Sequence, residues 1–218
     1  MKRLAFTLVL ALPGLASAQE PAPKPAQAPT KVEGVKLTER FIKASGDAVQ
    51  GLAEAKLQLQ TTLASYNALV NELSKDRRGD YKKLQKAVVE TNKRVSETQL
   101  RLATMDGEAN AYFDGWTGSL ENITNPDLRK RSAERLEDSE KRYAGILAAL
   151  QQARKEFDPF MTALGDQVTY LGHDLNPSAA ASLKPDQLKL NERGEKVFAR
   201  ADDAIRTAND YIRALRPE

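Results

Sequence analysis

Apolar residues recur every three or four positions along most of this chain, and this spacing predicts long amphipathic helices. The first series begins at Leu37 and runs without a missed step through Phe41, Ala44, Ala48, Leu52, Ala55, Leu59, Leu63, Tyr66 and Val70 to Leu73. The charged segment from Ser74 to Asp80, which contains Gly79, then breaks the period. It predicts a turn between two antiparallel helices.

A second series of apolar and small residues predicts a helix from Tyr81 to Ile123. Its members are Tyr81, Leu84, Val88, Thr91, Val95, Thr98, Leu102, Met105, Ala109, Tyr112, Trp116, Leu120 and Ile123. At ~1.5 Å per residue such a helix is about 60 Å long. It must therefore lie along its neighbours rather than inside a globule.

The third predicted helix extends from Asn125 to Asn176. Asn125-Pro126-Asp127 is a strong helix start, because Asn can cap exposed N–H groups and Pro needs no donor in the first turn. The residues expected to face inwards, which we call the seam of a helix, are here Leu128, Ser132, Leu136, Ser139, Tyr143, Leu147, Leu150, Ala153, Phe157, Phe160, Leu164, Val168, Leu171 and Leu175. Its phase is kept across Asp158-Pro159, which predicts a bend there rather than a break.

The rest of the chain predicts a short Ala-rich turn from Ser178 to Leu183 and a last helix that begins at Pro185-Asp186. The residues expected to face inwards on this helix are Leu188, Val197, Ala201, Ile205, Ala208, Ile212 and Leu215. The predicted fold is all-α. It is an elongated antiparallel coiled-coil bundle of three long helices plus a shorter C-terminal helix packed against one end, formed by one domain over 34–218.

The first 33 residues are predicted to lie outside this bundle. Met1-Lys2-Arg3, an apolar run from Leu4 to Leu15 and Ala16-Ser17-Ala18 form the three parts of a signal peptide over 1–18, with cleavage after Ala18. An N-terminal membrane anchor is the weaker alternative, because the run is too short to span ~30 Å of hydrocarbon. Residues 19–33 are rich in Pro and Ala and predict a disordered linker. The expected location is therefore periplasmic or secreted.

Composition fits this picture and narrows the classes of partner. The chain has 218 residues, of which 41% are hydrophobic, 29% charged and 6% aromatic, and it has no cysteine. Stability must therefore come from packing without disulfides. The formal net charge of +3 includes Lys2 and Arg3. Without its signal peptide the chain is nearly neutral, which argues against nucleic acid as a partner.

The best candidate for a functional motif is the end of the third predicted helix, where Asp166, Gln167, Tyr170, His173 and Asn176 lie. Helical spacing puts the first, third and fourth of these on one face, where they could share hydrogen bonds or hold a metal ion. One histidine with scattered carboxylates lacks the ligand density of zinc motifs. The favoured interpretation is structural: His173 and Asn176 close the helix. We expect no catalytic residue, cofactor or metal, and no enzymatic activity.

Tyr112 and Trp116 form a second candidate site, at the end of the second predicted helix. Glycines at 115 and 118 would let another backbone come close to them. The favoured interpretation is a buried aromatic anchor for the end of the bundle. A ligand pocket or a docking patch is the alternative.

Four stretches have the character of motifs: Leu128 to Ser132, Arg142-Tyr143, Asp158-Pro159 and Asp166 to Asn176. Together they resemble an uncharacterised family of exported bacterial proteins with an Asp-Gln-Val-x-x-Leu-x-His-x-Leu-Asn signature. The resemblance extends from about Gly34 to Arg213. It implies a domain of unknown function with long helices and no established activity. That family usually has Lys, Asn and Ala where this chain has Gly172, Asp174 and Pro177.

These patterns favour a non-enzymatic periplasmic structural or interaction protein that binds an unidentified protein or envelope partner. One alternative is a module that binds anionic lipid at the membrane surface, because basic residues cluster at Lys75 to Arg78, Lys82-Lys83 and Arg129 to Arg131. Acidic neighbours dilute these clusters, so any membrane contact is expected to be weak. Another alternative is a holdase-like periplasmic chaperone. The seams could be satisfied within one chain, or a remaining apolar stripe could drive oligomerisation.

Overall fold

The computed structural model describes residues 31–71 and 76–216, and these residues form helices without any strand. In chain order the helices are α1 (Lys31–Val70), α2 (Arg77–Leu120), α3 (Pro126–His173), α4 (Pro177–Ser182) and α5 (Lys184–Leu215). The prediction of an all-α fold is confirmed. The predicted signal peptide and most of the predicted linker lie outside the described residues, whereas 31–33 already belong to α1.

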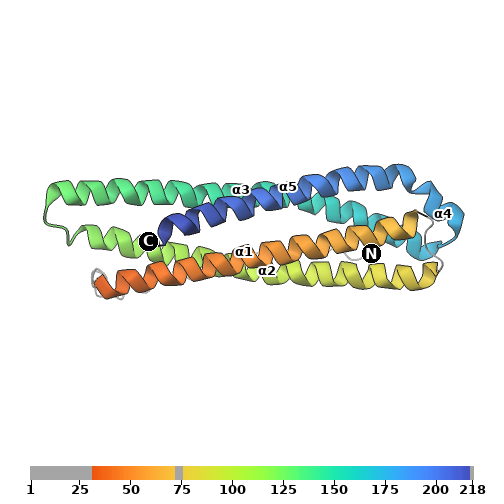
Figure 1. The fold of residues 1–218 in the computed structure, drawn as a ribbon, viewed down its shortest axis with the longest axis horizontal. Coiled ribbons are helices and arrows are strands. Elements are labelled where there is room, and N and C mark those ends of the chain that lie inside the picture. The colour runs from red at the N-terminus through yellow and green to blue at the C-terminus, as the bar shows by residue number, and fades with distance from the viewer. Residues whose placement is uncertain (1–30, 72–75, 217–218) are drawn as a thin grey trace, which may run out of the picture.

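The four long helices lie side by side and give the molecule the shape of a rod, with α4 at the end where the chain passes from α3 to α5 (Figure 1). At ~1.5 Å per residue the 48 residues of α3 extend about 70 Å. Helix α1 packs most extensively on α2, and α3 on α5, while α5 also packs on α1. Helix α5 therefore runs along the bundle. From the sequence this helix was expected at one end, so that part of the predicted arrangement is not confirmed.

Side-chain caps define the starts of α3, which was predicted as a helix, and of α4, which was predicted as a turn. The Asn125 side chain accepts hydrogen bonds from the N–H groups of Asp127 and Leu128, at 3.0 and 3.1 Å. Helix α3 then continues unbroken through Pro159. The Ala-rich segment predicted as a turn is instead the short helix α4, because Asn176 caps it by accepting from Ala179 N–H at 2.8 Å.

Three predicted inward positions are wrong: Leu128, which is 49% exposed in the first turn of α3, Leu147 and Leu188. Leu147 is 42% exposed while its neighbour Ile146 is buried, and Leu188 is 65% exposed while Leu190 is buried. On α5 the cause is visible in the sequence: the buried face includes Gln187 and Gly194, which interrupt the apolar spacing. The nearest leucine was therefore assigned to the wrong face.

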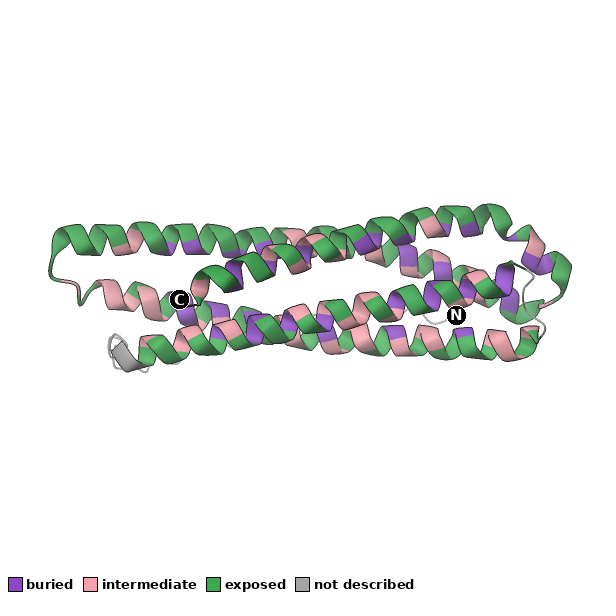
Figure 2. Ribbon diagram, viewed as in Figure 1, coloured by how far each residue is buried: buried purple, intermediate pink, exposed green. Residues whose placement is uncertain are grey.

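The interior consists of two hydrophobic cores, one near each end of the rod, and Figure 2 shows the buried positions on the inward sides of the long helices. The core nearer α4 contains Leu63, Tyr66, Leu84, Phe160, Leu171 and Leu190 among its buried residues. The other core surrounds Phe41, which has no exposed surface. Its ring contacts Tyr112, Phe113, Tyr143 and Tyr211, with centroids 5.4 to 6.0 Å away. These rings come from all four long helices, so they hold the second core together.

Gly194 allows α5 to approach α1 and α3 closely in the core nearer α4. A Cβ atom at this position would lie 2.7 Å from Cδ2 of Leu63 and 3.4 Å from a ring carbon of Phe160. Both of those side chains are buried. A larger residue at 194 would therefore push the helices apart.

We predict that Gly194→Leu lowers the free energy of unfolding by about 1–3 kcal/mol through overpacking, measured by urea denaturation. Gly145→Leu is the matched control, because Gly145 is exposed on α3 and a Cβ there would meet nothing within 4 Å. The free energy of unfolding of the control variant should rise by up to ~1 kcal/mol, since glycine is a poor helix former. Equal shifts in the two variants would contradict the close approach.

Candidate functional site

The motif at the end of α3 joins this helix to α1 and α2. Gln167 accepts a hydrogen bond from the hydroxyl of Tyr66, a fully buried residue of α1. One residue further along, the backbone carbonyl of Val168 accepts from the hydroxyl of Tyr81 on α2 at 3.1 Å. Gln85 in turn donates to that hydroxyl at 3.2 Å. The Gln-Val part of the motif therefore serves packing between helices.

Tyr66 keeps its proton under all ordinary conditions. Burial raises its pKa well above the usual value of a phenol, and the negative charge of Asp186 adds to the effect. A protonated hydroxyl is a donor, which suits the amide oxygen of Gln167. This contact is a structural hydrogen bond between α1 and α3.

Beside it lies a network of amides that the sequence analysis missed. Gln187 of α5 is only 5% exposed and donates to the side chain of Asn67 at 2.8 Å. Asn67 of α1 in turn donates to Asn191 of α5 at 2.8 Å. Gln187 lies one helical turn before Leu190, on the same face, so its place on a buried seam was the available signal. The network fixes the register of α1 against α5.

The remaining motif residues lie at the surface and serve the turn. The hydroxyl of Tyr170 is 3.2 Å from Oγ of Ser182, next to the end of α4. Asn176 donates its backbone and side-chain N–H groups to Asp174, at 3.0 and 2.9 Å, while it caps α4. Asn176 thus bonds within the turn that follows α3 and caps the next helix, whereas at the end of α3 the N–H of Asp174 donates to the carbonyl of Tyr170.

Asp166 and His173 are both exposed. No hydrogen bond or ion pair of either side chain is present within the described part of the chain. In the same part, no three His, Cys, Asp or Glu side chains are close enough together to hold a metal ion. The predicted face of Asp166, Tyr170 and His173 is thus not joined by shared hydrogen bonds.

Gly172 has a clear physical role within the motif. A Cβ atom at this position would collide with the hydroxyl of Tyr81. That hydroxyl is the donor to Val168 described above. The glycine therefore leaves room for the bond between α2 and α3.

The two residues of the predicted aromatic anchor differ in burial. Tyr112 is 8% exposed and belongs to the aromatic core, with its ring 5.6 Å from that of Trp116. Trp116 is half-buried, and its indole N–H donates to Oγ of Ser132 across the α2–α3 hairpin at 3.0 Å. These contacts support the interpretation as an anchor for this end of the bundle.

Burial also raises the pKa values of the other tyrosines in this core. The pKa of Tyr211 rises to about 12, mainly through burial, and Ser139 lies 2.6 Å from its hydroxyl. The pKa of Tyr143 rises further, because burial is reinforced by its hydrogen bond to Asp106 at 2.8 Å. Both phenols therefore remain neutral at physiological pH, and Tyr143 donates to Asp106.

A cavity of about 380 Å³ lies between the two cores, and sequence reasoning missed it. All four long helices line it, over 52–59 in α1, 95–102 in α2, 150–158 in α3 and 197–201 in α5. Its walls are mainly apolar. The charged side chains that line it are Lys56, Arg154 and Asp158.

The cavity exists because three helices present alanine at one level of the bundle. Ala55, Ala153 and Ala201 all occupy seam positions and all line the cavity. Each seam taken alone tolerates an alanine, and only their alignment leaves unfilled space. The signal was therefore present in the sequence, but it required the register between helices.

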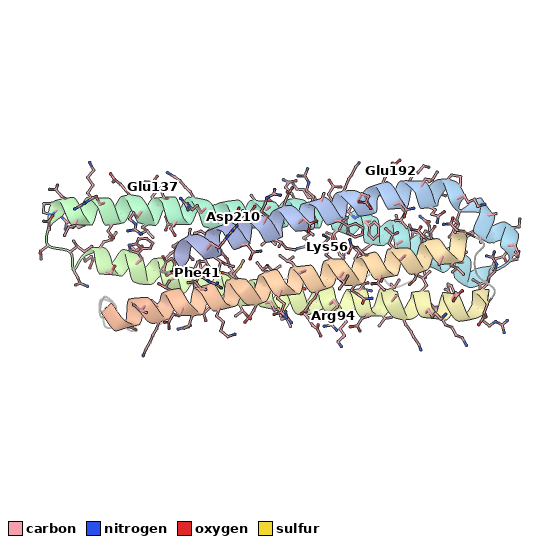
Figure 3. The ribbon with its side chains drawn as sticks, viewed as in Figure 1. Phe41, Lys56, Arg94, Glu137, Glu192 and Asp210 are labelled. Carbon is pink, nitrogen blue, oxygen red and sulfur yellow. The ribbon has the colours of Figure 1, made fainter. Side chains whose placement is uncertain are left out.

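Lys56 extends from α1 to α5 at the side of this cavity (Figure 3). Its ammonium group lies 2.6 Å from both carboxylate oxygens of Asp202. Arg154 is more exposed, at 75% of its side chain, and makes a longer contact of 3.4 Å with Asp158. The cavity thus combines an apolar interior with a border of two ion pairs, Lys56 with Asp202 and Arg154 with Asp158.

We predict that the motif separates into a structural part and a part with little effect on stability. Tyr66→Phe removes the donor to Gln167 and should lower the free energy of unfolding by about 1 kcal/mol. His173→Ala should stay within about 0.5 kcal/mol of the wild type, because the side chain is exposed. Thermal and urea denaturation measure both, and a larger loss from His173→Ala would contradict this division.

Comparison with known proteins gives a family for this chain. Residues 27–215 match the family described as "Protein of unknown function (DUF2959)". No curated protein and no solved structure matches the chain. Because the match covers nearly the whole helical domain, the chain belongs to this family of proteins of unknown function.

Proposed function

We propose that this protein is a non-enzymatic structural or interaction protein of the periplasm, a coiled-coil rod that binds a protein or envelope partner through one end. The observation that carries this proposal is the projecting connection between α2 and α3. It lies farther along the rod than the described start of α1 and the end of α5 (Figure 1). A hairpin that extends beyond its neighbours is accessible to a partner.

The surface of this projection has the character of a contact site. We define the hairpin tip as residues 116–132. Leu128 is 49% exposed there, and the next three residues, Arg129 to Arg131, are exposed as well. Trp116 and Ile123 are half-buried beside them. The tip thus presents an exposed apolar residue next to charged ones, and protein interfaces combine apolar contacts with a polar rim.

The helix ends support the same assignment. At the opposite end, the motif on α3 uses Gln167 and the carbonyl of Val168 in contacts with α1 and α2. Groups engaged in packing between helices make that end rigid. A rigid rod with one accessible tip suits a role in holding or spacing a partner.

Binding to anionic lipid is the second candidate, favoured by the basic residues Arg129, Lys130 and Arg131 at the hairpin tip. All three are exposed. Lys130 makes a weak surface ion pair with Glu134, in which the two charged atoms are 4.0 Å apart. Within the described residues, no helix has a stretch long and apolar enough to span a bilayer. Contact of these basic residues with anionic head groups would be electrostatic and sensitive to salt.

Export is testable by the mass of the protein in cell fractions. We predict that the periplasmic fraction contains a chain that starts at Gln19, because the residues before it form a signal peptide. Deletion of residues 4–15 should leave the protein in the cytoplasm. A full-length chain starting at Met1 and retained in the cytoplasm would contradict the proposed location.

Partner binding is testable by site-specific photo-crosslinking in living cells. A crosslinking residue at Leu128 should give a discrete protein adduct, because this residue lies at the hairpin tip. The same residue at Leu188, which is 65% exposed near the other end, is the matched control. Adducts of equal yield at both positions, or none at Leu128, would overturn the assignment of the tip. Adducts of lipid alone at Leu128 would select the second candidate.

A further inference from the structure

We propose that the cavity between the two cores is a binding site for one anionic amphiphile with a single alkyl chain. This inference does not depend on the hairpin tip, because the cavity lies in the middle of the rod. Its basis is the size of the space, the chemistry of its walls and the hydrogen-bond donors at its border.

The size suits a small ligand. A volume of about 380 Å³ falls within the ~300–1,000 Å³ typical of ligand pockets. An engineered apolar cavity of about 150 Å³ already holds one benzene molecule. The present space is more than twice as large, so it can take an alkyl chain of moderate length but not two chains side by side.

The walls favour hydrocarbon over a polar ligand. Leu52, Leu59, Leu102, Leu150 and Phe157 contribute from three helices, and Val197 contributes from α5. An unfilled apolar space deprives its lining of contacts and lowers stability. A chain that fills the space would restore those contacts and stabilise the bundle.

The border favours a negative head group. Both oxygens of Asp202 are already held by Lys56, and Asp158 faces the guanidinium of Arg154. Arg154, in contrast, has five N–H donors, of which only one has a partner among the described residues. A carboxylate or phosphate at the border would therefore find four N–H donors of Arg154 without a partner among the described residues. A cationic head group would find one such acceptor, Oδ1 of Asp158.

The cavity is partly open to solvent, so a chain could enter from the side with the head group left at the surface. Carboxylate and phosphate head groups both offer negatively charged oxygens that can accept hydrogen bonds from Arg154, but they come from different classes of lipid. A free fatty acid brings the first, and a single-chain lysophospholipid brings the second. Both therefore belong in the test.

The experiment is calorimetric titration of the purified mature chain with dodecanoate below its micelle concentration. We expect binding of one molecule per chain, at least tenfold tighter than that of dodecyltrimethylammonium, which has the same alkyl chain and the opposite charge. Arg154→Gln should abolish most of this difference. Lysophosphatidylglycerol in a parallel titration identifies which source binds tighter, and binding of either as a single molecule supports the site.

Variants that fill the cavity test its location. Ala153→Leu should weaken dodecanoate binding at least tenfold, while Ala148→Leu on the exposed face of α3 should leave it unchanged. Ala201→Leu and the exposed Ala199→Leu form a second pair on α5, so a folding failure in one variant leaves the test intact. No binding by the wild type, equal binding by the filled and control variants, or no preference for the anionic head group would each overturn the proposal.

Discussion

The close approach of α1 and α2 is the interaction on which the rest of the bundle depends. Thr98 donates to the backbone carbonyl of Gly51 at 3.0 Å, and the hydroxyls of Thr62 and Thr91 are 2.8 Å apart. A Cβ atom on Gly51 would lie 3.0 Å from Cδ of Arg101. Small residues bring the two backbones together here, and their buried hydroxyls find partners within the interface. This arrangement fixes the register of the pair.

A bundle built in this way has unequal interfaces. Helix α2 is held against α1, and α3 packs mainly on α5, so α2 and α3 share a smaller interface. The two cores are therefore filled where large side chains meet from all four long helices. Between them, at the level of the α1–α2 threonines, three alanines leave the central cavity. The cavity therefore follows from the alignment of small residues on α1, α3 and α5 beside the tight pair.

The sequence was sufficient for the four long helices and for the starts of α3 and α5, because capping and apolar spacing act within a few residues. Asn125 and Pro126 identified the start of α3 without any knowledge of its neighbours. The phase of α5 could not be obtained in the same way. Its buried face includes Gln187, which has partners on another helix, and Gly194, which is needed for a close approach. Contacts with other helices determine why these two residues are buried, and the spacing of apolar residues within one helix does not reveal such contacts.

The same distinction explains why the cavity was missed while its three alanines were noted. An alanine in a seam is neutral until the residue opposite is known. Ala55, Ala153 and Ala201 became informative only when the fold placed them at one level. Leu147 shows the converse case, because the spacing admitted either it or Ile146, and contacts with α5 and the aromatic core decided for the isoleucine.

The motif that contains the lone histidine now has a physical explanation that does not require chemistry at His173. Tyr81 can donate to Val168 only if nothing larger than glycine stands at position 172. Tyr81 and Gly172 must therefore change together: a side chain at 172 requires that the residue at 81 be shortened or rotated away. This coupling joins α2 to the last turn of α3, next to Leu171, which is fully buried in the core. The specificity of the motif then arises from three helices meeting in one place, and His173 follows as the first exposed residue beyond that contact.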